Sequence, residues 1–211
     1  MRHPGHSIGA SWAVAVWLGT FFLVLVWSAW KPHDYPTWWL EVIPALVAFV
    51  ILALTRVRFP LTPLLYGLIL VHAVILMVGG HYTYAEVPLG DWVRDWIGGE
   101  RNNYDKLGHL AQGFVPAVLA RELLLRFNVV NGRAWLALIV VSICLAFSAF
   151  YELIEWWVAL LSAEAADSFL GTQGYVWDTQ SDMFLALVGA CLAILLLSSV
   201  HDRQLRQLGS G

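Results

Sequence analysis

The chain has 211 residues, of which 59% are hydrophobic and 13% charged, and its formal net charge at pH 7 is −3. A soluble domain of this size cannot bury so much apolar side chain, so the composition predicts an integral membrane protein. The chain has no basic arm or stripe, and we expect no nucleic acid partner. Both cysteines, Cys144 and Cys191, lie inside apolar runs and do not indicate a disulfide framework.

Six apolar runs are long enough to cross a bilayer, which takes about 17–25 residues per helix. We therefore predict an all-α polytopic membrane protein with six transmembrane helices in one bundle. The bundle forms a single domain over residues 1–208, and residues 209–211 are set apart as a tail. The predicted spans, in chain order, are 11–30, 38–54, 64–80, 105–127, 133–161 and 178–200.

The longest polar connection, 81–103, separates the third span from the fourth. Its Trp92 and Trp96 are four residues apart, which predicts a short amphipathic helix near residues 90–98 that lies on the membrane surface. A second polar loop, 162–177, has no Lys or Arg and is expected on the same, outer side.

The distribution of basic residues predicts the orientation, because Lys and Arg are enriched in cytoplasmic loops. Most of them fall on the side of the two termini. The other side carries only Lys31, Arg94, Arg101 and Lys106. Both termini are therefore predicted to be cytoplasmic, with the lipid bilayer as the surrounding partner.

Three pairs of polar residues fall at one depth, near the outer ends of the last three spans. The pairs are Asp105 with His109, Glu152 with Glu155, and Asp178 with Asp182. The members of each pair are three or four residues apart, so they share one helix face. Ionisable side chains within a membrane need a partner, a cavity or an ion. We predict that all six converge in one water-accessible cavity, roofed by segment 81–103 and walled by Trp156, Trp157 and Trp177.

Five carboxylates and one imidazole at one place require compensation by shared protons, by neighbouring cations such as Lys106 or Arg101, or by a divalent metal ion. Oxygen and imidazole ligands suit Mg, Mn, Fe or Zn and do not choose among them. The predicted metal ligands are Asp105, His109, Glu152, Glu155 and Asp182. The alternative is a set of interhelical hydrogen bonds with no ligand.

The first class of function that fits is a metal-dependent hydrolase acting on a lipid-linked or amphipathic substrate, such as a phosphate ester. Its predicted catalytic residues are His109, Glu152 and Asp178, and its predicted substrate-binding residues are Lys106, Gln112, Trp156 and Trp177. The second is a small cation- or proton-coupled transporter. The inner halves of the last three spans are almost free of polar residues, which favours a one-sided site. A non-catalytic scaffold is a third reading, and the oligomeric state is not predicted.

Other polar residues have simpler interpretations. A lone histidine in a span, such as His72, is expected to bond a neighbouring helix. His81 and Tyr82 fall at the outer end of their span, and whether they join the cavity is left open. Glu122 and Arg126 are four residues apart and are predicted to form a local ion pair.

Three motifs resemble the YjdF family of bacterial inner-membrane proteins: NYDKLGH at 103–109, YELIEWW at 151–157 and GTQGYVWDTQSDM at 171–183. The resemblance covers nearly the whole chain and implies a multi-pass protein of the bacterial inner membrane, in a family of unknown function. More distantly, the order of these motifs is similar to that of VanZ-like membrane proteins. Many of those have an amide where this chain has Glu155 and Asp182.

Overall fold

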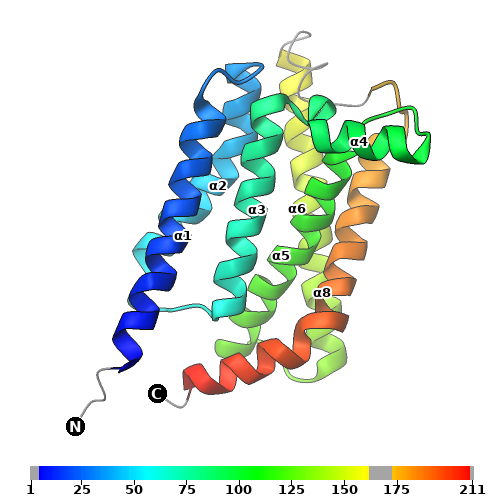
Figure 1. Ribbon diagram of the computed structural model, residues 1–211. Coiled ribbons are helices and arrows are strands. Elements are labelled where there is room, and N and C mark those ends of the chain that lie inside the picture. The colour runs from blue at the N-terminus through cyan, green and yellow to red at the C-terminus, as the bar shows by residue number, and fades with distance from the viewer. Residues whose placement is uncertain (1–4, 162–172, 210–211) are drawn as a thin grey trace.

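The computed structural model describes residues 5–161 and 173–209, and all regular structure in these residues is helical. The long helices are α1 (Gly5–Ala29), α2 (Tyr35–Thr55), α3 (Pro63–Tyr82), α5 (Tyr104–Arg126), α6 (Arg133–Leu161) and α8 (Asp178–Gly209). They run side by side as one bundle, with the short helices η1 (Tyr84–Glu86) and α4 (Pro88–Ile97) at one end (Figure 1). The all-α fold and the short helix near residues 90–98 are thus confirmed.

Five of the long helices have the length and apolar composition of membrane spans: α1, α2, α3, α6 and α8. The 23-residue α5 is also long enough, at roughly 35 Å with 1.5 Å per residue, but it is too polar to meet the same criterion. It packs against α3, α6 and α8, so other helices rather than lipid cover much of its surface. The crossing by α5, and with it the six-span topology, stays a prediction.

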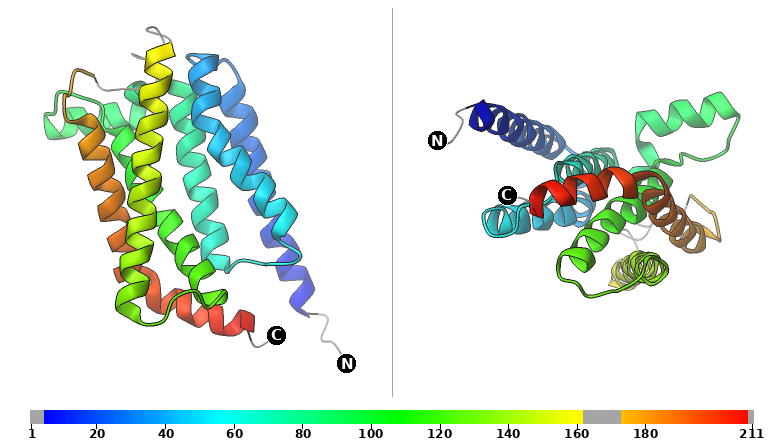
Figure 2. Two further views of the ribbon diagram at one scale, coloured as in Figure 1. Left: turned by 180° about the vertical axis from the view of Figure 1, so that it is seen from behind. Right: turned by 90° about the horizontal axis from the view of Figure 1, so that it is seen from below.

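The last helix differs most from its predicted bounds, because α8 continues to Gly209 instead of ending at residue 200. Its final part bends beneath the bundle, at the end opposite α4 (Figure 2). Residues 201–209, which follow the predicted span, are therefore helix, held to α5 by the polar contacts of His201 described below. α1 begins at Gly5, earlier than predicted, and residues 162–172 of the second polar loop lie outside the described part.

Two helix starts follow directly from the sequence. Asp34 precedes α2, and its carboxylate accepts a hydrogen bond from the Thr37 backbone N–H at 2.8 Å. Thr62 precedes α3 in the same role, followed by Pro63 at the first helical position. Such capping residues satisfy backbone donors that have no partner within the helix, and proline tolerates the first turn.

Two glycines allow α5 and α8 to pack backbone to backbone. A Cβ atom at Gly113 would overlap the carbonyl oxygen of Ala186, and one at Gly189 would overlap that of Leu110. Small residues permit such close approach between membrane helices. His109 lies one turn from Gly113, and Asp182 one turn from Ala186, so this contact places the two helices' polar residues beside each other.

The close contact at Gly113 gives a test of the packing. Gly113→Ala should lower the free energy of unfolding by about 1–3 kcal/mol, because the added methyl group forces two backbones apart. Thermal unfolding of the purified protein in detergent measures the change. Gly67→Ala is the matched control: its Cβ would meet open space, and alanine in mid-helix should stabilise by about 0.5–1 kcal/mol. Equal melting temperatures for the two variants would contradict the packing.

Candidate functional site

The structure brings the six predicted site residues together at the α4 end of the bundle. They form two groups, whose ligand atoms lie within 4.8 Å of one another: His109, Glu152 and Glu155, and Asp105, Asp178 and Asp182. The imidazole of His109 joins the groups. Its Nδ1 lies 3.8 Å from Glu152 Oε1, and its Nε2 lies 3.9 Å from Asp182 Oδ2. All five carboxylates are buried.

Arg101, just before α5, neutralises two of these carboxylates. Its Nη1 donates to Asp178 Oδ1 and its Nη2 to Asp105 Oδ2, both at 2.6 Å. The other oxygen of Asp105 accepts from the backbone N–H of Lys106 at 2.7 Å. One guanidinium therefore ties the start of α5 to the start of α8. Asp105, a predicted metal ligand, and Asp178, a predicted catalytic residue, already have a cationic partner.

Two carboxylate oxygens of the residues next to His109 have no hydrogen-bond partner among the described residues. They are Glu152 Oε1 and Asp182 Oδ1, on side chains whose residues are 7% and 3% exposed. Leaving a buried carboxylate oxygen unpaired is costly, so such atoms indicate a ligand or a proton.

The hydrogen bond of His109 orients its ring toward the same place. Its Nδ1 lies 3.1 Å from Gln112 Oε1. An amide oxygen can only accept, so with the Gln112 amide in this orientation the contact assigns the proton to Nδ1 and leaves the lone pair of a neutral ring on Nε2, which lies 3.9 Å from Asp182 Oδ2. A histidine that ligates a metal is typically oriented in this way by a hydrogen bond from its other nitrogen.

A cavity of about 530 Å³ lies between α2, α3, α5 and α6, beside this cluster. Ligand sites commonly measure 300–1,000 Å³. Its polar lining residues are Glu41, His72, Tyr84, Asp105, His109, Gln112, Tyr151, Glu155 and Asp182. Its apolar ones include Leu76, Pro116, Leu119, Ala120, Leu123, Leu124, Ile143, Phe147 and Phe150. Along α5 the polar residues come first and the apolar ones follow, so the cavity has a polar end and an apolar end.

Sequence reasoning missed part of this polar lining. Glu41 of α2 is buried, and its Oε2 accepts a hydrogen bond from the Tyr151 hydroxyl at 3.4 Å. A single acid inside an apolar run was a signal that could have found it. His72 lines the cavity, although it was expected only to bond a neighbouring helix. Tyr84 of η1 supplies part of the roof that segment 81–103 was predicted to form.

The predicted tryptophan walls are wrong. Trp156, Trp157 and Trp177 are all exposed on the outside of the bundle. None of the three is among the described residues that line the cavity. Of the other predicted substrate-binding residues, Gln112 lines the cavity.

Lys106 and His81 have partners of their own. The ammonium of Lys106 lies 5.0 Å from the centre of the Tyr175 ring, on the outer side of the site. His81 Nδ1 contacts the backbone oxygen of Ser28 at 3.0 Å, and its ring packs against Tyr82. Neither His81 nor Tyr82 is among the described lining residues of the cavity.

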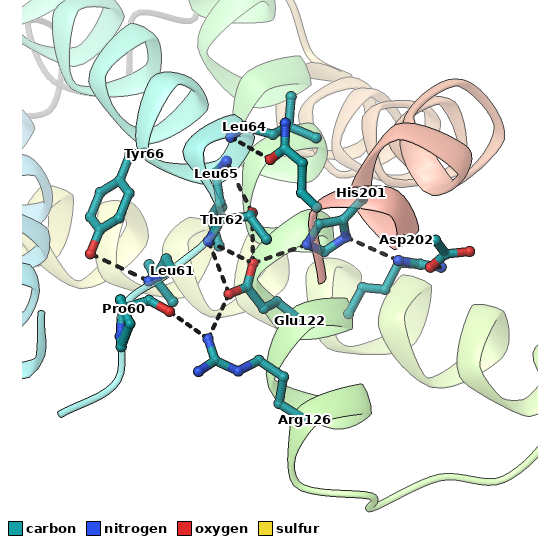
Figure 3. Close-up of polar contacts among 12 residues, drawn as sticks. Pro60, Leu61, Thr62, Leu64, Leu65, Tyr66, Glu122, Arg126, His201 and Asp202 are labelled. Atoms are coloured by element: carbon teal, nitrogen blue, oxygen red, sulfur yellow. Dashed lines mark hydrogen bonds and ion pairs between the residues drawn. The ribbon is translucent and has the colours of Figure 1, made fainter. Parts of the chain in front are cut away.

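A second polar cluster lies at the opposite end of the bundle, centred on Glu122 (Figure 3). The predicted ion pair with Arg126 is present at 2.9 Å. Glu122 also accepts from the Thr62 hydroxyl at 2.8 Å and contacts His201 Nε2 at 3.0 Å. Arg121 in turn contacts His201 Nδ1. Thr62 and His201 are 60 and 79 residues from Glu122 in sequence, so only the Arg126 pair had a local signal.

The comparisons with known proteins agree with this architecture. Residues 13–203 match the family model described as "Predicted membrane protein (DUF2238)". The chain is 54% identical over 190 residues to the inner membrane protein YjdF of Escherichia coli (strain K12), covering 90% of this chain and 91% of that protein. No solved structure matches the chain.

Proposed function

The chain belongs to the DUF2238 family of predicted membrane proteins, and we propose that it is a metal-dependent hydrolase that acts on a lipid-linked or amphipathic molecule. The curated relative is named an inner membrane protein, so we assign this chain to the bacterial inner membrane as well. The excess of Lys and Arg on the side of the two termini supports a cytoplasmic position for both. One observation carries the proposal. The cavity combines a histidine and carboxylates at one end with apolar side chains at the other.

The polar end suits a divalent cation. His109, Glu152 and Glu155 offer ligand atoms within 4.8 Å of one another, and no described Lys or Arg pairs with them. The unpartnered oxygen of Asp182 can provide a fourth ligand. Imidazole and carboxylate ligands fit Mn, Fe, Zn or Mg. Asp105 and Asp178, held by Arg101, would position the site rather than bind the ion.

The cation would supply the nucleophile, because a divalent metal acidifies its bound water. In hydrolysis of a phosphate ester, the water oxygen forms a bond to phosphorus and the bond from phosphorus to the alcohol oxygen breaks. Glu152, bound to the cation through one oxygen, would accept the proton of the water on its other oxygen and return it to the leaving alcohol. A cation would also offset the repulsion between a phosphate and the acids of the site.

Metal binding is the decisive test. We expect added Mn²⁺ or Zn²⁺ to raise the melting temperature of the wild type, since a ligand at 100 times its Kd stabilises by about 2.7 kcal/mol. Glu152→Gln and Asp182→Asn should lose this rise, and EDTA should abolish it in the wild type. Asp95→Asn, an exposed acid on α4, is the control and should keep it. An equal rise in all variants, or none in the wild type, would refute the metal site.

The Glu122 cluster favours a second candidate, a small cation- or proton-coupled transporter. It places buried ionisable groups at the other end of the bundle, where the sequence predicted almost no polar path. The cavity between the two clusters is lined at its lower part by Leu119, Leu123 and Leu124, which offer no polar route. Ion flux in proteoliposomes discriminates the two functions: the transporter requires a flux that Glu122→Gln removes, and the hydrolase requires none.

A further inference from the structure

The apolar end of the cavity reaches the outer surface of the bundle. Phe147 and Phe150 of α6 both line it, yet they are 61% and 53% exposed. A residue that borders a cavity and is also more than half exposed lies at the cavity's mouth. The mouth therefore lies along α6, within a segment long and apolar enough to span a membrane.

The opposite edge of this mouth belongs to α2. Glu41 and Pro44 of α2 line the same cavity. α2 packs mainly on α3, whereas α6 packs on α5 and α8. The two helices thus stand on either side of the cavity, with α5 as its floor. The back view of the bundle shows α2 and α6 as neighbouring outer helices with α5 behind them (Figure 2).

The cavity also has depth along the membrane normal. Its lining on α5 extends from Asp105 to Leu124, about 28 Å at 1.5 Å per residue. That length is most of the roughly 30 Å hydrocarbon core of a bilayer. Beyond Gln112 the α5 lining consists of Pro116, Leu119, Ala120, Leu123 and Leu124, without a polar side chain.

The occupant of such a groove has to be apolar along its length. An extended peptide segment would leave its backbone N–H and C=O groups unpaired there, at a cost of several kcal/mol each. A hydrocarbon chain has no such groups, and the groove is continuous with the lipid-facing surface of α6. We infer that the cavity opens sideways to the bilayer between α2 and α6, and that the acyl chain of a membrane lipid enters there and lies along α5 with its head group at the polar end.

This inference rests on the proposed function only where it places the lipid head group at the polar end. Photolabelling tests the position of the acyl chain independently of metal binding. The full chain is reconstituted in nanodiscs of phosphatidylethanolamine and phosphatidylglycerol, with a trace of phospholipid carrying a diazirine at the end of one acyl chain. After irradiation, mass spectrometry locates the adducts. We expect adducts on Ala120 and its neighbours on α5. Ala120 is buried, so lipid that only coats the bundle cannot reach it.

Ala120→Phe fills the apolar end and should cause loss of the adducts on α5. Ala15→Phe is the matched control, because the same change on the exposed surface of α1, which contributes no described lining residue to the cavity, should leave them in place. Adducts confined to outward-facing residues of the wild type would overturn the inference, even if the protein binds metal. Adducts on α5 in a protein that binds no metal would support the inference and refute only the hydrolase.

Discussion

Arg101→Ala is expected to lower the free energy of unfolding by about 3–5 kcal/mol, the loss typical when one partner of a buried ion pair is removed. The arginine donates to Asp105 and Asp178 at 2.6 Å each, and its side chain is 14% exposed. Without it, two buried carboxylates face each other with no counter-charge, and the start of α8 loses its tie to α5. Chemical or thermal unfolding in detergent measures the change.

The control for Arg101 is Arg94, which also contacts two aspartates. Arg94 pairs with Asp91 and Asp95 on the exposed surface of α4. Water screens such pairs, so Arg94→Ala should leave the stability close to that of the wild type. In the Arg101→Ala background, Asp178→Asn should restore part of the lost stability, because it removes one of the two uncompensated charges. Similar losses of unfolding free energy for Arg94→Ala and Arg101→Ala would show that burial does not determine how much these ion pairs contribute to stability.

The convergence of the acidic residues could be predicted because it depends on topology and helix geometry alone. Once α5, α6 and α8 are placed antiparallel in turn, Asp105, Glu152 and Asp178 reach the same depth. The three-or-four spacing then fixes which side of each helix carries the pairs. Sequence does not reveal which helices adjoin, and this is why Glu41 was missed. Its helix, α2, comes far earlier in the chain and meets the site only across the cavity.

The role of Arg101 shows a different limit. It was foreseen as one of several possible counter-cations, together with Lys106, but loop geometry decides between them. The guanidinium reaches two carboxylates at once, whereas the Lys106 ammonium lies over the Tyr175 ring. The prediction that tryptophans wall the cavity was wrong for a third reason. Tryptophan is common at the membrane interface irrespective of any site, so its position along a helix does not tell which way it faces.

The contacts of the C-terminal part of α8 could not be predicted from the sequence, because they belong to a cluster that joins three helices, α3, α5 and α8. Glu122 is 0% exposed and receives hydrogen bonds from Thr62, which caps α3, and from Arg126. His201 contacts the same carboxylate and also Arg121. The span predicted from the sequence ends at residue 200. In the folded chain these contacts continue the helix and hold it beneath the bundle (Figure 3).

Glu122→Ala should therefore lower the stability of the whole bundle and also loosen the end of α8 locally. The free energy of unfolding should fall by about 3–5 kcal/mol, because removal of the fully buried carboxylate leaves His201, Arg126 and Thr62 without their common acceptor. The C-terminal part of α8 should also loosen locally, since the contact of His201 with Glu122 is lost while the contacts of this part with Arg121 and the Leu64 backbone remain. Hydrogen exchange should then rise in 201–209 well before the rest of the bundle opens. Exchange measured by mass spectrometry on the wild type and the variant detects this.

Glu86→Ala is a matched control, because Glu86 pairs with His33 at 2.9 Å but both side chains are about half exposed. The same Glu–His chemistry should contribute little there, and 201–209 should stay protected. Unchanged exchange of 201–209 in Glu122→Ala would mean that apolar packing alone holds the end of α8. Raised exchange of 201–209 with unaltered metal-dependent stabilisation would show that the Glu122 cluster has a structural role. If the cluster and His109 belonged to one ion pathway, Glu122→Ala should also change metal binding at His109.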